Sequence, residues 1–240
     1  MSTFRIVINT LANNPVLFVL KIIGRVKYAI RYYLLRDIKL RSYRDWLRDD
    51  GDHTLLVNCE LNSDDLVFDV GGYVGDFAAA ILTKSESNVF VFEPVKSFYD
   101  ICERRFSEVD AIRCYNFGLS DKEGDFEIAL EDDGSSLIKV NTVAPKEIVH
   151  TKSFMEFVRD NNIDEISLLK INIEGGEYDL LNQILDTGLI RDVRNLRVQF
   201  HDFIPHAKEM RESIRMRLSE THQEDWCYPF IWESWTRNVS

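Results

Sequence analysis

The chain has 240 residues, enough for one full-sized domain with a modest appendage, and this length excludes two independent enzymes. Its 45% hydrophobic and 29% charged residues are typical of a folded, water-soluble protein and exclude a disordered or collagen-like chain. With 29 Lys plus Arg against 40 Asp plus Glu, the net charge of −11 disfavours broad electrostatic binding to nucleic acid.

The first 44 residues differ in charge from the rest of the chain. They carry nine Lys or Arg and one Asp, a net charge of +8. Apolar residues recur at steps of three and four over residues 16–34, which predicts an amphipathic basic helix. Such a helix could pack on the main domain or attach to an anionic membrane surface. We therefore expect a basic N-terminal helical segment over 1–44 and one large domain over 45–240.

Two absences in the sequence bear on location. The longest uncharged stretch, residues 6–20, is too short and too polar to cross a bilayer, and it lacks a signal-peptide pattern. The four cysteines are widely spaced, without a pair or a Cys/His cluster that would indicate zinc. We expect a reduced cytoplasmic protein without a metal site, whose N-terminal helix is a candidate for peripheral contact with the inner membrane face.

From about residue 55, short apolar runs alternate with longer helical patterns. This alternation predicts a doubly wound α/β sheet. We expect strands at residues 66–70, 89–92, 111–117, 166–173 and 196–200, an extra β segment at 125–130, a helix at 205–221 and two last strands within 226–235.

Residues 66–75 read Leu-Val-Phe-Asp-Val-Gly-Gly-Tyr-Val-Gly, a buried strand that runs into a glycine-rich turn, and a helix is expected from about Asp76. In a doubly wound sheet the ligand crevice lies at the carboxyl ends of the strands, where this turn sits. Glycine lets the backbone approach a ligand closely. Val70 stands where a dinucleotide fingerprint needs glycine, and no P-loop Lys-Ser/Thr follows.

Two acidic residues mark the ends of the first two strands. Asp69 precedes the glycines, where a carboxylate would repel a pyrophosphate but suits S-adenosylmethionine, which carries a sulfonium and an ammonium and no phosphate. Glu93 follows eighteen residues after Gly75, at a position where carboxylates accept hydrogen bonds from ribose hydroxyls. Alternatively, Asp69 caps the following helix and Glu93 is a solvated strand end. We interpret the pair as a nucleoside-binding site.

Five segments together resemble the FkbM family of S-adenosylmethionine-dependent methyltransferases, at residues 67–75, 91–94, 116–121, 169–178 and 198–201. They cover about residues 65–202 in the family's order. The resemblance implies a class I methyltransferase fold, a Rossmann-like and mostly parallel seven-stranded sheet with an antiparallel last strand. It also implies O-methylation, often of sugars. The family more often has Asp where this chain has Asn172.

The resemblance and the strand pattern together assign the cofactor contacts. The glycine turn would lie beneath the amino-acid moiety of S-adenosylmethionine, with Glu93 on its ribose. A Gly-Ser-Ser sequence at 134–136 resembles a family loop near the cofactor, although it is also typical of a plain turn. The assigned cofactor residues are Asp69, Gly71, Gly72, Tyr73, Gly75, Glu93, Asn116 and Ser136.

Methyl transfer from a sulfonium to a hydroxyl is an in-line displacement that needs alignment and a base. Lys170, Asn172 and Glu174 would alternate along the predicted strand 166–173 and share a face. Asn172 and Glu174 would orient the acceptor hydroxyl, and Lys170 would keep Glu174 ionised. A purely structural Lys170–Glu174 ion pair is the alternative.

His201 ends the next predicted strand, and histidine is the side chain best suited to accept a proton near neutral pH. We expect it to be the general base, although it could simply hydrogen-bond a loop carbonyl. The predicted function is O-methylation of a sugar hydroxyl in a glycan, surface polysaccharide or glycolipid precursor. Alternatives are a natural-product or lipid hydroxyl as acceptor, or a nucleoside-binding protein without catalysis.

Overall fold

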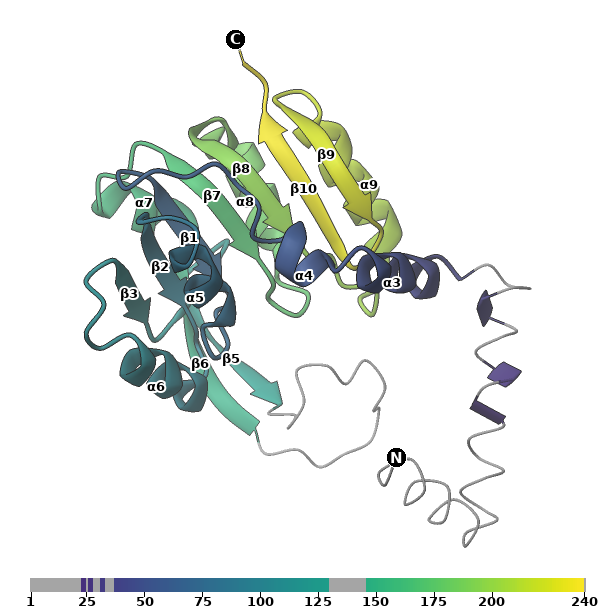
Figure 1. Ribbon diagram of the computed structural model, residues 1–240, viewed down its shortest axis with the longest axis horizontal. Helices are drawn as coiled ribbons and strands as arrows, with labels where there is room; N and C mark the ends of the chain where they lie inside the picture. Colours follow the sequence, from purple (N-terminus) through teal and green to yellow (C-terminus); the bar gives the residue numbers. More distant parts are fainter. Residues whose placement is uncertain (1–22, 25, 28–30, 33–36, 130–145, 240) are drawn as a thin grey trace, which may run out of the picture.

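The computed structural model describes residues 23–24, 26–27, 31–32, 37–129 and 146–239, and its centre is a seven-stranded sheet (Figure 1). The strands lie in the order β3-β2-β1-β7-β8-β10-β9. β10 runs antiparallel to both its neighbours, while the other pairs are parallel. The expected class I methyltransferase fold is therefore confirmed. The strands are β1 (Leu66–Val70), β2 (Asn88–Phe92), β3 (Ile112–Tyr115), β7 (Ile166–Ile171), β8 (Val193–Val198), β9 (His222–Tyr228) and β10 (Trp232–Arg237).

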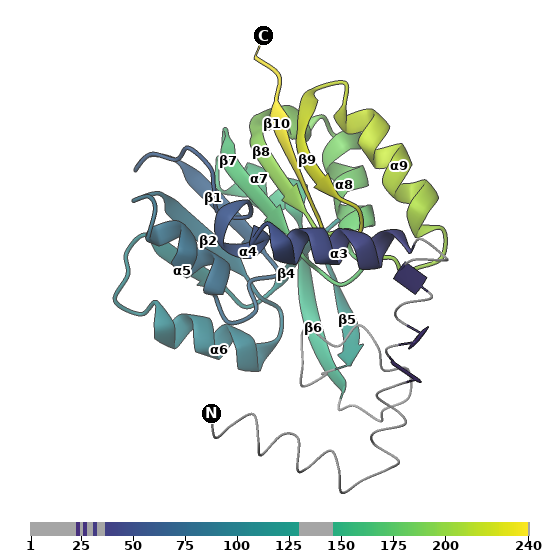
Figure 2. The same ribbon diagram turned by 45° about the vertical axis from the view of Figure 1, so that its right-hand side comes forward.

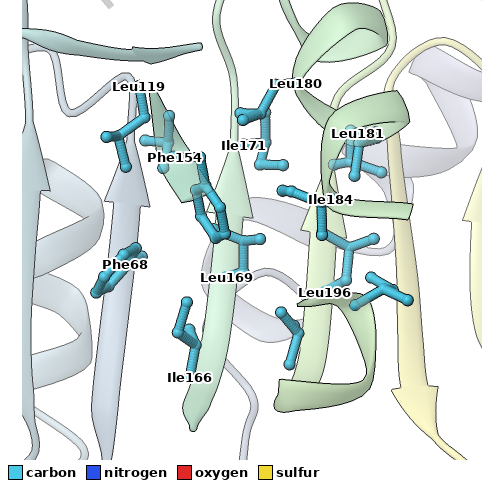
Figure 3. Packing of buried hydrophobic residues seen from close by; sticks show 14 of the residues in the cluster. Phe68, Leu119, Phe154, Ile166, Leu169, Ile171, Leu180, Leu181, Ile184 and Leu196 are labelled. Atoms are coloured by element: carbon cyan, nitrogen blue, oxygen red, sulfur yellow. The ribbon is translucent and has the colours of Figure 1, made fainter. Parts of the chain in front are cut away.

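Helices cover both faces of this sheet and form two cores. On one face, α7, α8 and α9 pack against the strands, and Figure 3 shows apolar side chains of α7 and α8 beside those of β1, β7 and β8. On the other face lie α3, α5 and α6. Because both faces are covered, β7 is buried at every residue. The helices are α3 (Ile38–Arg48), α4 (Gly51–Thr54), α5 (Asp76–Leu82), α6 (Lys96–Arg105), α7 (Phe154–Asp160), α8 (Glu177–Asp186) and α9 (Ala207–Leu218), with a 3-10 helix at Leu189–Asp192.

A second sheet of three strands, in the order β4-β6-β5, is added to the class I core. It comprises β4 (Gly118–Ser120), β5 (Gly124–Ala129) and β6 (Lys146–Ser153). β5 matches the predicted extra segment, whereas β4 and β6 were not predicted. Figure 2 shows β5 and β6 projecting away from the large sheet. Residues 130–145, which include Ser136, lie outside the described residues.

Helix α3 crosses the predicted boundary between residues 44 and 45. Asp37 caps its amino end by accepting a hydrogen bond from the Leu40 N–H at 3.0 Å. Trp46 is 2% exposed and packs on Trp226 and Tyr228, with ring centroids 5.6 and 5.2 Å apart. Part of the segment assigned to the N-terminal unit is therefore continuous with the core. Most of the predicted apolar stripe at 16–34 lies outside the described residues. Within the described ranges, no helix is both long and apolar enough to cross a membrane.

Candidate functional site

The carboxyl ends of β2, β1, β7 and β8 lie side by side in the sheet. Among the described residues, six that are not glycine have positive φ, and four of these lie in loops that follow strands at this edge: Tyr73, Glu174, His206 and Phe230. A positive φ is strained for residues with a Cβ, and such strain concentrates at functional sites. The strained backbone positions therefore lie at the same edge of the sheet as the sequence motifs, which supports a functional site there.

The glycine turn after β1 is fixed by contacts with its neighbours. Gly71 has φ +82°, and a Cβ there would lie 1.9 Å from the carbonyl oxygen of Asn172. A Cβ on Gly72 would lie 2.2 Å from Cγ1 of Val91. The sequence suggested that these glycines make room for a ligand, whereas the structure shows that packing within the protein already requires them. Helix α5 begins after Gly75 without a side-chain cap, which excludes a capping role for Asp69.

Asp69 and Lys170 form a buried ion pair between β1 and β7. The Lys170 ammonium lies 2.8 Å from Asp69 Oδ1 and donates to the Gly71 carbonyl oxygen at 2.7 Å. Burial raises the pKa of the Asp69 carboxyl, and the Lys170 charge opposes that rise. Asp69 Oδ2 is buried without a hydrogen-bond partner. Lys170 therefore stabilises the glycine turn by binding both Asp69 and the Gly71 carbonyl oxygen.

The predicted alternation of Lys170, Asn172 and Glu174 along one strand is wrong. β7 ends at Ile171, and Glu174 lies in the following turn with φ +48°. Lys170 pairs with Asp69 across the sheet, so the alternative Lys170–Glu174 ion pair does not form, and the prediction that Lys170 keeps Glu174 ionised is wrong. Asn172 follows the strand directly, and its Oδ1 is a second buried acceptor without a partner.

Glu93 lies at the end of β2 with only 6% of its surface exposed, so it is not a solvated strand end. Its Oε2 accepts the Tyr73 N–H at 2.7 Å, and its Oε1 accepts the Val95 N–H at 2.9 Å. Burial raises the pKa of Glu93 to about 7 against the lowering effect of these hydrogen bonds. The Asn116 amide donates to the carbonyl oxygens of Glu93 and Pro94, both at 3.1 Å. Glu93 and Asn116 thus hold the loops that flank the glycine turn.

His201 follows β8 and is 3% exposed. Its Nδ1 lies 3.1 Å from Glu177 Oε1, and its Nε2 lies 3.6 Å from Glu174 Oε2. Burial lowers the pKa of His201, but the interactions with Glu174 and Glu177 outweigh it and raise the pKa to about 9. The contact with His201 lowers the pKa of Glu174, whose side chain is 71% exposed. The two neighbouring glutamates therefore favour the protonated form of His201.

Sequence reasoning missed two charged residues at this edge. Glu177, the first residue of α8, is fully buried, and an acid directly after Gly-Gly at a helix start was the signal available in the sequence. Lys39 on α3 reaches Asp202 at 2.5 Å. Because 163 positions separate Lys39 from Asp202, no local pattern could have paired them. The carboxyl end of β8 is thus bordered by α3.

One group in the described part of the chain has the spacing of metal ligands. Glu224, Cys227 and Glu233 on β9 and β10 offer atoms within 4.8 Å of one another. Arg211 Nε donates to Glu233 at 2.5 Å, its NH2 group lies 3.1 Å from the Cys227 sulfur, and Arg215 bonds both glutamates. Since guanidinium groups occupy these ligand atoms, the group fits a structural ion network better than a cation site.

Comparison with known proteins shows to which family the chain is similar. Residues 69–221 match the Methyltransferase FkbM domain. The Hexuronic acid methyltransferase AglP of Haloferax volcanii is 29% identical over 178 residues, which cover 72% of this chain and 71% of that protein. An rRNA methylase structure from Streptococcus thermophilus is 11% identical with a TM-score of 0.47, over 80% of this chain and 96% of that one. The ribosomal protein L11 methylase of Lactobacillus delbrueckii subsp. bulgaricus is 16% identical with a TM-score of 0.43, over 80% and 78%. Because the domain match spans more than half of its residues, the chain belongs to the FkbM methyltransferase family.

Proposed function

We propose that this protein is an S-adenosylmethionine-dependent O-methyltransferase that methylates a sugar hydroxyl of a glycan, surface polysaccharide or glycolipid precursor. Family membership supports methyl transfer. The name of the AglP relative, a hexuronic acid methyltransferase, supports a sugar acceptor. The observation that carries the proposal is the convergence of Asp69, Glu93 and His201 on one edge of the sheet.

The hydrogen-bond acceptors at this edge fit S-adenosylmethionine. Asp69 Oδ2 and Asn172 Oδ1 are buried acceptors without partners, one before and one against the glycine turn. Buried acceptors need a donor, and the ammonium of S-adenosylmethionine supplies N–H groups and a positive charge. A dinucleotide would instead bring phosphates toward Asp69. When bound, S-adenosylmethionine supplies a methyl group activated by its sulfonium.

Glu93 is the residue we assign to the ribose. Each of its oxygens accepts one backbone N–H, and a carboxylate has further lone pairs for hydroxyl donors. Ionised Glu93 is the better acceptor, so we expect cofactor affinity to fall as pH drops through about 7. The exposed ring of Tyr73, edge-on to Phe98 at 4.4 Å, borders the same loop.

On the acceptor side, His201 Nε2 is the atom we assign to take the hydroxyl proton. Glu174 occupies the space beside it, and an acceptor hydroxyl reaches Nε2 when the exposed Glu174 side chain moves away. That movement removes one of the two carboxylates that raise the pKa of His201, and its pKa then falls toward the range in which a base works at neutral pH. Asn172 directly follows the neighbouring strand, and we assign its amide nitrogen to orient the acceptor.

Untargeted product analysis tests the proposal. The protein is incubated with methyl-labelled S-adenosylmethionine and extracts of host sugar nucleotides and glycolipids, with His201→Ala as the control. We expect label on a sugar hydroxyl, lost in the control. Label on a lipid or natural-product hydroxyl would shift the acceptor class. No label at all would favour a nucleoside-binding protein without catalysis.

A further inference from the structure

The first two residues of α8 hold His201 at three points. The Glu177 carboxylate accepts the His201 backbone N–H at 2.7 Å and lies 3.1 Å from Nδ1. The Tyr178 hydroxyl donates to the His201 carbonyl oxygen at 2.8 Å. Nε2, the remaining polar atom of the residue, faces Glu174 instead of α8. The backbone and Nδ1 of His201 are therefore held by α8, and Nε2 is the atom left to meet an acceptor.

Burying the Glu177 carboxylate costs free energy that its contacts must offset. It is fully buried, and a buried carboxylate is tolerated when it is paired and hydrogen-bonded. Its second oxygen accepts the Gly175 N–H at 2.8 Å, and the amino end of α8 stabilises its charge. The Gly175 contact also fixes the turn that carries Glu174, so one carboxylate positions both groups at the acceptor side.

We infer that Glu177 is a positioning residue that keeps the imidazole proton of His201 on Nδ1 and so presents the Nε2 lone pair to the acceptor. The inference rests on the proposed base role of His201. A carboxylate can only accept, and buried Glu177 lies closer to Nδ1, at 3.1 Å, than exposed Glu174 lies to Nε2, at 3.6 Å, so neutral His201 keeps its proton on the nitrogen that faces Glu177. The charged groups around the ring are Glu177 from α8, Glu174 from the β7–α8 turn and the Lys39–Asp202 pair beyond it.

Nitrogen-15 NMR of the full chain labelled at histidine reports both the tautomer and the pKa of His201 without any acceptor. We compare wild type with Glu177→Gln, Glu174→Gln and Tyr178→Phe. Either glutamine should lower the pKa of His201 by about 1 to 3, since each removes one nearby carboxylate. Glu177→Gln alone should also move neutral His201 to a mixture of Nδ1–H and Nε2–H tautomers. Tyr178→Phe, which keeps the ring contacts, should leave the Nδ1–H tautomer in place.

Methyl transfer then separates this inference from the function on which it rests. Glu177→Gln should slow single-turnover transfer by about 10²- to 10⁴-fold at saturating cofactor, as expected when a base loses its correct tautomer. An unchanged tautomer and pKa in a folded Glu177→Gln protein would overturn the inference and leave Glu177 as a partner of backbone N–H groups. If the tautomer shifts but the rate of methyl transfer is unchanged, Glu177 does orient the imidazole ring, and His201 is not the base.

Discussion

The two sides of the carboxyl edge are built by different interactions. At β1 and β2 the backbone sets the shape, because Gly71 packs on the Asn172 carbonyl and the Glu93 carboxylate receives two backbone N–H groups. At β8 charged side chains set it, with His201 held between Glu174 and Glu177. The first side, whose shape is set by backbone contacts, is the one that we assign to the cofactor. The second includes the Glu174 side chain, which is 71% exposed, so we expect this side to distinguish one acceptor from another.

The largest loss of stability is expected when the buried Asp69–Lys170 ion pair is broken. Lys170→Met leaves Asp69 as an unpaired buried carboxylate, which costs about 3 to 5 kcal/mol of unfolding free energy. Because the pKa of Asp69 is already raised by burial, the loss should shrink as pH falls and Asp69 becomes protonated.

Denaturant unfolding at several pH values measures this loss, with Lys170→Met/Asp69→Asn as the matched control. The double variant should be more stable than Lys170→Met near neutral pH. A loss that is independent of pH and equal in both variants would show that the ion pair is not what the variant breaks.

The next-largest effect is expected at Gly71, whose backbone packs against the Asn172 carbonyl. Gly71→Ala places a methyl group against the Asn172 carbonyl at a positive φ, and we expect a loss of about 2 to 4 kcal/mol from strain and overpacking. Gly188→Ala has nearly the same φ, +79°, with no atom within 4 Å, so it should lose only about 1 to 2 kcal/mol. Equal losses in urea unfolding would remove the steric argument for Gly71.

On the acceptor side, the activity should depend on the ionisation of His201. A base works only when deprotonated, so kcat/KM for the acceptor should rise with pH up to about 9. Glu174→Gln should move this rise to lower pH, since one of the two carboxylates is gone. The contribution of His201 to folding has the opposite trend. Its pKa is raised above the 6.5 of an ordinary histidine, so the stability that it adds is present below 6.5 and is lost as pH rises through about 9.

These pH profiles can also contradict the account. A profile that stays flat between pH 6 and 10, or one that Glu174→Gln leaves unshifted, would exclude His201 as the base. His201→Ala should lower the rate by about 10²- to 10⁴-fold with cofactor affinity nearly intact.

The weakest effect concerns the basic segment that precedes α3. Residues 1–36 carry six Lys or Arg and no acid, and each cation near an anionic surface contributes about 1 kcal/mol. We propose that this segment makes peripheral contact with an anionic membrane face. Sedimentation with phosphatidylserine vesicles should show binding that salt weakens. Deletion of 1–36 spares the Asp37 cap of α3 and should abolish binding; unchanged sedimentation would refute the membrane contact.

Much of the fold could be predicted because buried parallel strands read as apolar runs. β1 was predicted at its observed bounds, and the antiparallel last strand followed from the family resemblance. β6 was missed because six of the eight residues in its sequence, KEIVHTKS, are polar and because it belongs to an added sheet. The boundary at residue 44 was drawn on charge, whereas Trp46 draws α3 into the core.

The site was less predictable because its contacts cross between strands and loops. The glycine turn and Glu93 could be found from their spacing along one strand–turn–helix unit. Lys170 faces Asp69 through the β1–β7 register, which no local pattern contains. Glu174 was assigned by period-two alternation, but the chain leaves the strand at Ile171. The high pKa of His201 depends on Glu174 and Glu177, which come near it only in the folded chain.

Titration calorimetry with S-adenosylmethionine tests the central claim, that the β1–β2 side binds this cofactor and the β8 side does not. Wild type and His201→Ala should bind with affinities within about threefold, because His201 serves the acceptor. Glu93→Ala should bind about 10- to 100-fold more weakly, the cost of losing hydrogen bonds to a charged group, and Glu93→Gln should lie between. Equal affinity in wild type and Glu93→Ala would remove Glu93 from the site, and preferential binding of NADH would contradict the assignment of the cofactor.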